Sequence, residues 1–561
     1  MRVFVLLTFL LKCASAATHV DIKAFGARAG DGSDSSPAVR AALRSKPKKL
    51  VFPKGRYDFY PTYALEKYLF ISNNDEGLKR IAFPIIGFDS LEIDGQGSQF
   101  VFHGFMSPFL VERSKNVTLK NFSIDFERTF HSEARVIAIS EDGVDLEIAE
   151  QYPYRVDKGI LLFTGKAKEP YPIGNILEFD ARRRETAYQA RDFYTGPYVE
   201  AESIGPRKVR IDVPKLTATV GNILVFGAAN RNHPGFTISD STGTLLSGIS
   251  IYHCGGMGVI AQRSRDIELD HVQVTPSPGS GRVVSITADA THFVNCTGRI
   301  VMTHCLFENQ KDDATNIHGI YAQIARQLAP NEIEVRLVHP QQFGFDFILP
   351  KERLELVHSP GMITYGEAMV KSVERLNKEY TRVVFTAPLP KELKTGDVVA
   401  SAQAGPEVTI ANCTIRNNRA RGLLLGSRGK TVIEDNVFHT PGAAILFEGD
   451  ARFWFEQAGV RDLTIRRNRF ENCNYGVWGK ATIEVGAGID PSQRALSRYN
   501  RNITIEDNLF RVFDSGRIVL AYSVDGLTIR KNRIERTTEY PPARPAAEPY
   551  DIKDSSNVLM K

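Results

Sequence analysis

A pair of related aspartate motifs carries the strongest chemical signal in this sequence. Asp289 lies in the run ADATH, and Asp312 and Asp313 open the run DDATN. Carboxyl groups gathered on one patch can share a proton, because a neighbouring negative charge raises the pKa of a carboxyl group. One carboxyl can then protonate a leaving oxygen while another activates a water, as glycoside hydrolysis requires. The motifs therefore predict a glycosidase site, with a cation site or a solvated polar turn as alternatives.

The spacing of the two motifs matches an internal repeat. Asp289 and Asp313 are 24 residues apart, and short β-branched runs followed by Asn or His recur at this interval or at stretched intervals of 32 and 40 residues. Units of this kind cannot bury their apolar faces alone and are typical of a parallel β-helix. Adjacent coils would place the two aspartates roughly 4.8 Å apart at the backbone. We also expect a ladder of hydrogen-bonded asparagines at one turn, formed by Asn412, Asn436, Asn468, Asn508 and Asn532.

Two strand-rich segments interrupt the coil pattern, at residues 131–232 and 320–404. They end alike, in VGNILV and TGDVV, and we interpret them as two similar small β-barrels. The predicted fold is all-β, a right-handed parallel β-helix of the pectate-lyase type with two inserted barrels. The expected order is a signal peptide at 1–16, a cap and first coils at 17–130, barrel 1 at 131–232, coils with the aspartates at 233–319, barrel 2 at 320–404, and C-terminal coils and tail at 405–561.

The N-terminus predicts export followed by a capped solenoid. Arg2, the apolar run over 3–11 and the small residues at 14–16 are typical of a secretory leader. The periplasm, the cell surface and the medium all fit as destinations. Further on, Ser36 as N-cap and Pro37 at the first helical position predict a short helix that resembles the cap of pectate-lyase-like β-helices.

Composition excludes several other classes of protein. The 561 residues are 42% hydrophobic and 24% charged, which excludes a disordered chain. The net charge of +5 is scattered and indicates no nucleic-acid partner. Beyond the leader, no segment reaches the about 18 apolar residues that a membrane span needs. The cysteines outside the leader lack CxxC spacing, so we expect buried free thiols rather than disulfides or zinc ligands.

The paired motif resembles glycoside hydrolase family 110. The resemblance is carried by residues 288–296 and 312–319 and by the segment RNHPG at 231–235, and it covers nearly the whole chain. That family comprises bacterial exo-acting α-1,3-galactosidases on a β-helix with inserted barrels. They remove terminal α-1,3-linked galactose, as in the blood group B determinant, with inversion and without a metal.

The resemblance has several consequences for this chain. It implies that Asp289, Asp312 and Asp313 are catalytic. We assign Asp312 as general acid and expect the other two aspartates to hold and activate the water. It implies a glycan substrate and no cofactor, and it admits a homodimer built through the insertions.

A further overlay of repeats adds two arginines to the site. Aligning Phe307 with Ile415 matches Asp313 to Arg421. Arg419 and Arg421 would then lie on the next coil, where they could hold sugar hydroxyls or tune a carboxylate by charge. Both arginines could instead be ordinary surface residues.

Other residues are candidates for sugar binding. Asn316 and His318 follow the aspartates, although His318 could equally be a turn histidine bonded to the backbone. Trp454 could pack against the apolar face of galactose, or it could be a core residue. Glu448, which lies in the same stretched unit, could accept hydrogen bonds from sugar hydroxyls. We interpret Trp478 as structural.

Two other functions remain compatible with this scaffold, because one fold hosts many activities. The first is a different enzyme, either another exo-glycosidase or a calcium-dependent polysaccharide lyase. The second is a glycan-binding β-helix without catalysis. Neither the choice between branched and linear substrates nor the oligomeric state follows from the sequence.

Overall fold

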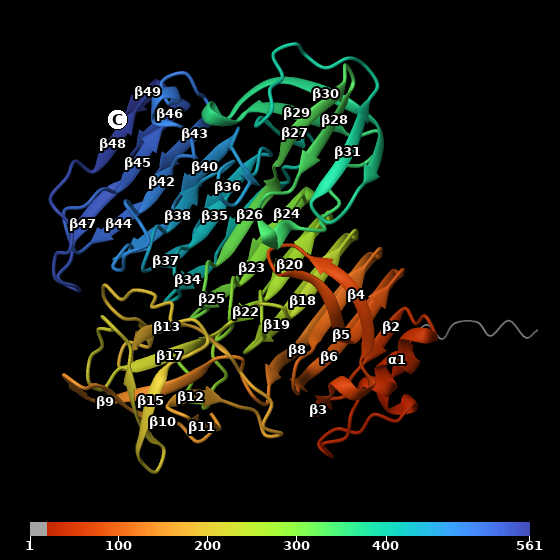
Figure 1. The fold of residues 1–561 in the computed structure, drawn as a ribbon, viewed down its shortest axis with the longest axis vertical. Helices are drawn as coiled ribbons and strands as arrows, with labels where there is room; N and C mark the ends of the chain where they lie inside the picture. Colours follow the sequence, from red (N-terminus) through yellow and green to blue (C-terminus); the bar gives the residue numbers. More distant parts are fainter. Residues whose placement is uncertain (1–18) are drawn as a thin grey trace, which may run out of the picture.

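The computed structural model describes residues 19–561, so the predicted leader at 1–16 lies outside the described residues. Within that range the chain winds into a parallel β-helix whose strands stack along one axis from the cap to the C-terminus (Figure 1). Two long sheets form its walls, and the strand-to-strand pairing within them is parallel apart from the pairings β4–β5 and β26–β39.

The larger sheet contains 21 strands within the described residues. Its main column of paired strands is β1 (His19–Asp21), β2 (Lys49–Val51), β6 (Asp89–Phe102), β8 (Lys115–Phe126), β19 (Thr242–Ile251), β21 (Arg265–Asp270), β24 (Thr297–Thr303), β33 (Glu407–Ala411), β36 (Thr431–Glu434), β40 (Leu463–Arg466), β43 (Asn500–Glu506), β46 (Val524–Arg530) and β49 (Ser556–Met560). Beside it lie β3 (Arg56–Phe59), β22 (Gln273–Val274), β25 (Leu306–Glu308), β34 (Thr414–Arg416), β37 (Val437–His439), β41 (Arg469–Glu471), β44 (Leu509–Val512) and β47 (Arg533–Arg536).

The second sheet carries the candidate site and contains 13 strands within residues 19–561. They are β4 (Leu65–Ile71), β5 (Asp75–Ile86), β7 (Ser107–Glu112), β18 (Phe236–Ser239), β20 (Val259–Gln262), β23 (Thr291–Val294), β26 (Thr315–Ile320), β35 (Leu423–Leu425), β38 (Ile445–Phe447), β39 (Glu456–Gln457), β42 (Ile483–Val485), β45 (Val519–Tyr522) and β48 (Tyr550–Lys553).

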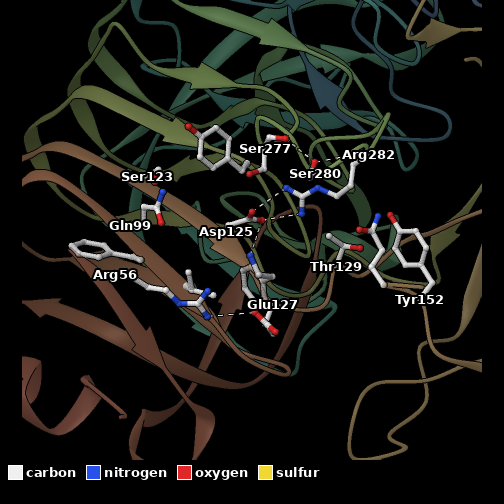
Figure 2. Close-up of a pocket in the computed structure, with 15 residues that line it drawn as sticks. Arg56, Gln99, Ser123, Asp125, Glu127, Thr129, Tyr152, Ser277, Ser280 and Arg282 are labelled. Atoms are coloured by element: carbon white, nitrogen blue, oxygen red, sulfur yellow. Dashed lines mark hydrogen bonds and ion pairs between the residues drawn. The ribbon is translucent and has the colours of Figure 1, made fainter. Parts of the chain in front are cut away.

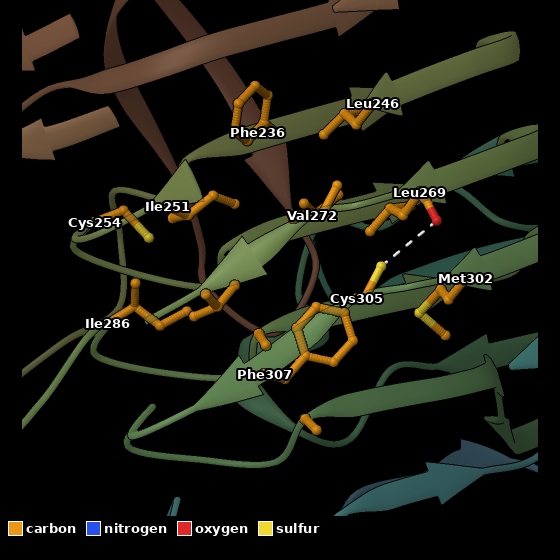
Figure 3. Close-up of a cluster of buried hydrophobic side chains, with 14 of the residues drawn as sticks. Phe236, Leu246, Ile251, Cys254, Leu269, Val272, Ile286, Met302, Cys305 and Phe307 are labelled. Carbon is orange, nitrogen blue, oxygen red and sulfur yellow. Dashed lines mark hydrogen bonds between the residues drawn. The ribbon is translucent and has the colours of Figure 1, made fainter. Parts of the chain in front are cut away.

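Along each strand, buried apolar side chains alternate with more exposed ones, which explains why these short segments stack. In β24, Ile300 and Met302 are fully buried while Val301 between them is not. Ile300 pairs in register with Ile267 on the preceding coil and with Val408 on the following one. Each such column is a continuous apolar wall, and burying one of these side chains stabilises the fold by about 1.5–3 kcal/mol. Figure 3 shows this interior, in which Phe236, Leu269 and Phe307 are among the labelled side chains.

The asparagine ladder forms, with one correction. Asn436, Asn468, Asn508 and Asn532 are linked by side-chain hydrogen bonds of 3.0–3.1 Å along successive coils. Asn412 is not a member, because the strand register places Cys413, whose backbone N–H donates to Asn436, at that position. The repeat there is 23 residues rather than the predicted 24.

The N-terminal cap contains the predicted helix, α1 (Ser36–Arg44). Its N-cap is Ser35 rather than Ser36, and the side chain of Asp34 supplies the capping hydrogen bond by accepting from Ser36 N at 2.8 Å. Asp34 therefore performs the role that we predicted for a serine. Among residues 19–561, no helix is long and apolar enough to cross a membrane. Cys254, Cys296, Cys305, Cys413 and Cys473 are free and buried, which confirms the prediction of buried thiols.

The two insertions leave the solenoid on opposite sides in Figure 1. The first is a nine-stranded antiparallel sheet made of β9 (Ser132–Ser140), β10 (Gly143–Ile148), β11 (Tyr154–Asp157), β12 (Ile160–Phe163), β13 (Ile173–Asp180), β14 (Glu185–Thr186), β15 (Glu200–Gly205), β16 (Lys208–Asp212) and β17 (Ile223–Ala228). The second closes into a six-stranded barrel made of β27 (Ala322–Ala329), β28 (Glu332–Arg336), β29 (Arg353–His358), β30 (Ile363–Arg375), β31 (Tyr380–Phe385) and β32 (Val398–Ser401).

Candidate active site

The β-helix register brings the three aspartates together. Asp289 lies two residues before β23 and Asp313 two residues before β26, and the first residues of these strands, Thr291 and Thr315, are paired. The two aspartates therefore occupy equivalent positions on adjacent coils. One carboxylate oxygen of each of Asp289, Asp312 and Asp313 lies within 4.8 Å of the others.

Arg421 lies on the next coil opposite Asp313, as the repeat overlay predicts. The pairing of Phe307 with Ile415 is confirmed. Arg421 donates to the Asp313 carboxylate from Nε at 3.0 Å and from Nη2 at 2.8 Å, and its backbone N–H donates to the same carboxylate. This bidentate contact fixes the orientation of Asp313.

Two other arginines hold Asp312. Arg419 donates from Nη1 to Asp312 Oδ1 at 2.8 Å, and Arg231 Nη2 lies 3.5 Å from Asp312 Oδ2. Burial opposes ionisation of Asp312, but the two guanidinium groups outweigh burial and lower its pKa below the ordinary value. Asp312 is therefore a carboxylate near neutral pH.

Hydrogen bonds around Asp289 indicate that this residue carries a proton. His318 Nδ1 donates to the carbonyl of Gly319 at 2.7 Å, which leaves Nε2 of a neutral His318 as an acceptor. His292 Nε2 lies 3.0 Å from that acceptor and therefore donates to it. In a neutral His292, Nδ1 then accepts, and its partner at 2.6 Å is Asp289 Oδ2. With both imidazoles neutral, because burial lowers the pKa of each, Asp289 is the donor in that contact.

The electrostatics agree with this proton position. Burial and the neighbouring Asp312 raise the pKa of Asp289 to about 8. Burial lowers the pKa of His292 to about 4, so the imidazole is neutral. Burial raises the pKa of Asp313 to about 6 even though Arg421 is bound to it. Near neutral pH the three carboxyl groups therefore share one proton, and it lies on Asp289 rather than on Asp312.

Most of the predicted sugar-binding residues line one cavity of about 210 Å³ with the three aspartates. Trp454 is 40% exposed at its rim and is not a core residue. Glu448 is exposed, and Asn316 lies on β26 with its side-chain amide 3.4 Å from Glu456. His318 does not line the cavity, because it is buried behind His292 and bonded to the backbone. The residues that do line it and were predicted for sugar binding are Asn316, Arg419, Arg421, Glu448 and Trp454.

Three contributors to the site were missed by sequence reasoning. Tyr194, 75% exposed, reaches the cavity from the first insertion. Asn73, in the turn between β4 and β5, donates to Glu456 at 3.2 Å. Asp192 lies behind the cavity and accepts from Arg419. All three are separated from the aspartate motifs by roughly 100 residues or more, and no repeat position marks them.

A larger cavity lies over the other sheet (Figure 2). Its charges are already paired: Arg282 donates to both oxygens of Asp125 at 3.0 Å, and Arg56 lies 3.4 Å from Glu127. It contains no group of neighbouring carboxyls comparable to the aspartates beside β23 and β26. The smaller cavity is therefore the candidate active site.

The three aspartates are a poor site for a divalent cation. Three oxygens within 4.8 Å could coordinate a metal ion. However, Arg419 and Arg421 already donate to two of the carboxylates, and Arg231 lies beside one of them. Those positive charges would repel a cation and would have to leave before it could bind.

Known proteins resemble this chain over nearly its whole length. It is 40% identical over 552 residues to α-1,3-galactosidase A of Shewanella woodyi, covering 97% of this chain and 90% of that protein. It is 32% identical over 572 residues to α-1,3-galactosidase B of Bacteroides thetaiotaomicron, covering 99% and 92%. This chain belongs to the α-1,3-galactosidase family, glycoside hydrolase family 110.

Family models agree with this membership in family 110. The GLAA-B β-barrel domains I and II match residues 132–224 and 332–399, and a right-handed β-helix region matches residues 398–561. The predicted right-handed β-helix is thereby confirmed, and both insertions match β-barrel models, although in residues 19–561 only the second closes into a barrel. A family 28 exopolygalacturonase from Yersinia enterocolitica aligns over 97% of this chain and 78% of its own with a TM-score of 0.40 and 9% identity, which carries no information on function.

Proposed function

We propose that this chain is an exo-acting α-1,3-galactosidase that hydrolyses terminal α-1,3-linked galactose. The observation that carries the proposal is the grouping of three carboxyl groups, with oxygens within 4.8 Å of one another, in a cavity that Trp454 and Arg419 also line. The names of the relatives supply the linkage and the sugar. The blood group B determinant and linear α-galactosyl glycans are the substrates to test first.

The shape of the cavity supports exo action. Its lining comes from the solenoid and the first insertion, and the second insertion supports the rim by packing against Trp454. Tyr194 comes from the first insertion, and His339, which follows β28 in the second, packs against Trp454 with ring centroids 4.6 Å apart. A compartment of about 210 Å³ bordered by Tyr194 and Trp454 suits one terminal sugar better than an internal segment of a polymer.

Acid and base catalysis would use the triad of Asp289, Asp312 and Asp313 as one unit. Strongly coupled carboxyls titrate together, so the proton belongs to the set. The proton lies on Asp289 near neutral pH, while the sequence assigns the general acid to Asp312. Asp312 can serve as the acid only if an entering sugar moves the proton from Asp289 across the few ångströms that separate the carboxyls. That assignment stays a prediction, and the remaining carboxylates would position and activate the water.

Inversion is part of the proposal on the strength of the family resemblance. In most glycosidases the two carboxyl groups are about 6.5–9.5 Å apart for inversion and about 5–5.5 Å apart for retention. The nearest oxygens of the three aspartates lie within 4.8 Å of one another, a shortest approach that is not a separation between carboxyl groups and assigns neither class. The stereochemistry must therefore be measured rather than derived from the spacing.

An NMR time course with the purified mature chain tests the proposed function. The substrates are blood group B trisaccharide and linear galactose-α-1,3-galactose, with a chelator present. We expect β-galactose as the first anomer formed, and no product from an Asp312→Asn variant. If neither sugar releases galactose, the proposal fails, and a glycan array would then ask whether the cavity only binds. Loss of activity on adding the chelator would instead favour a metal-dependent enzyme.

Export is proposed from the N-terminal sequence. Arg2 and the apolar run at 3–11 support it, and cleavage after Ala16 is the expected processing step. N-terminal sequencing of the protein recovered from the cell envelope or the medium tests it, and a chain retaining Met1 would contradict it.

A further inference from the structure

A second chamber adjoins the catalytic cavity. It has a volume of about 260 Å³ and lies over β38, β42 and β45 of the same sheet. Arg421 and Glu448 line both compartments and stand at the junction between them. The two chambers therefore form one cleft whose inner end holds the three aspartates.

The floor of this cleft is one continuous column of side chains. His292 pairs in register with Asn316, and Asn316 with Leu424. Leu424 in turn pairs with Leu446, which begins the second chamber. Beyond it the pairing continues to Glu484 and Leu520. From Asn316 to Glu484 the floor spans three coils, or about 14 Å at the usual interstrand spacing.

The walls of the second chamber are held rigidly by the protein. Trp478 Nε1 donates to Asp192 at 3.2 Å, which fixes the indole over the cleft. Tyr522 donates its hydroxyl proton to Ala487 O at 2.6 Å. Glu484 Oε1 accepts from the backbone N–H groups of residues 480 and 481. Fixed aromatic walls of this kind lose little conformational entropy when a ligand binds.

Two charged groups in this cleft are available to a ligand. Within residues 19–561, neither the carboxylate of Glu448 nor the ammonium of Lys480 has a hydrogen-bonding or ion-pairing partner in the protein, and both are exposed. Leu446 and Trp478 supply apolar surface beside them. Apolar faces bordered by a few free polar groups are the pattern that recognises a sugar ring.

We propose that the second chamber binds the sugar to which the terminal galactose is linked, together with any branch on that sugar. This inference rests on the proposed function, because it assumes that galactose occupies the cavity with the aspartates. The leaving glycosidic oxygen would then lie near Arg421 and Glu448, at the junction. The ligand is a neutral hexopyranose that packs on Leu446 and Trp478, with its hydroxyls bonded to Glu448 and Lys480.

Two variants and two substrates test this assignment. Leu520→Trp narrows the far end of the second chamber, and Lys480→Ala removes one free donor; neither residue lines the catalytic cavity. Galactose-α-1,3-galactose needs both chambers, whereas α-galactosyl fluoride has no second sugar. The measured quantity is the ratio of kcat/KM for the disaccharide to kcat/KM for the fluoride. Leu559→Trp and Lys430→Ala, at exposed positions outside both chambers, are the matched controls.

We expect this ratio to fall about tenfold in Leu520→Trp and about two- to tenfold in Lys480→Ala, with no change in the controls. If the disaccharide and the fluoride lose activity equally, or if the ratio is unchanged in both variants, the assignment is wrong. A wild-type chain that hydrolyses the fluoride but neither the disaccharide nor the branched blood group B trisaccharide also overturns it while leaving galactoside hydrolysis standing. A chain that hydrolyses none of the three overturns the proposed function as well.

Discussion

Asp192, in the first insertion, holds the guanidinium of Arg419 against Asp312 in the candidate active site. Arg419 Nε donates to both carboxylate oxygens of Asp192, at 2.9 and 3.1 Å, and Arg419 Nη1 donates to Asp312 at 2.8 Å. Asn175 and Trp478 also donate to Asp192, which is 6% exposed. Asp192 thus positions a charged group of the candidate active site without lining the cavity itself.

Replacing Asp192 tests this positioning role. In Asp192→Asn one negative charge is lost, so Arg419 interacts more strongly with Asp312 and lowers the pKa of the triad. We expect kcat to fall about 10- to 100-fold through misplacement of Arg419, with KM nearly constant. The alkaline limb of the pH–rate profile should move to lower pH. Asp142→Asn, at an exposed turn of the same insertion, is the control, and a profile unchanged in shape would rule out the role.

Changing the leaving group of the substrate shows which of the three aspartates is the general acid. Asn variants of Asp289, Asp312 and Asp313 should each lose about 10²–10⁴-fold in kcat on a disaccharide. Fluoride departs without protonation, so the variant that lacks the general acid should keep activity on α-galactosyl fluoride while the others lose it. Retention in Asp312→Asn supports the sequence-based assignment. Retention in Asp289→Asn would transfer the acid role to the residue that holds the proton near neutral pH.

The pH dependence of activity follows from the shared proton. Below about pH 6 Asp313 is protonated and the triad lacks its base, so activity should rise as pH increases through this value. Above about pH 8 Asp289 loses its proton and the triad has no acid, so activity should fall. We expect a bell-shaped profile of kcat/KM between these limits. A profile that is flat from pH 5 to 9 would contradict the shared-proton arrangement.

Trp454 should contribute apolar contact to the galactose ring. Removing the indole in Trp454→Ala should raise KM about tenfold, with a smaller loss in Trp454→Phe, which keeps an aromatic face. Phe453→Ala is the matched control, because Phe453 is adjacent and 64% exposed but does not line the cavity. Equal effects at the two positions would indicate that the loop is disturbed rather than that a sugar contact is lost.

The asparagine ladder should stabilise the C-terminal coils. In Asn468→Ala the ladder bonds to Asn436 and Asn508 are lost, and the carbonyl of Ile433 loses its donor. Burying these unpaired groups should cost about 3 kcal/mol. Asn532→Ala, at the partly exposed end of the ladder, should cost less. Urea denaturation followed by circular dichroism measures both, and equal midpoints for the two variants would contradict a cooperative ladder.

The repeat made much of this molecule predictable from its residues. A 24-residue separation places Asp289 and Asp313 on adjacent coils, and a 108-residue offset places Arg421 opposite Asp313, because stacked parallel strands keep a fixed register. The 24-residue spacing predicts the wrong ladder residue where a coil is one residue shorter, as at Asn412. The sequence alone does not show which turn of that coil is the shorter one.

The sequence by itself determined the solenoid, the positions of the two insertions and the identity of the three aspartates, since these follow from periodic burial and a local motif. Only the tertiary structure brought Asp192 and Tyr194 to the site, because the path of a loop within an insertion has no repeat to fix it. It also decided where the proton lies. Burial and the neighbouring Asp312 raise the pKa of Asp289, and its hydrogen bond to His292 continues through His318 to a backbone carbonyl; this arrangement exists only once two adjacent coils have packed together.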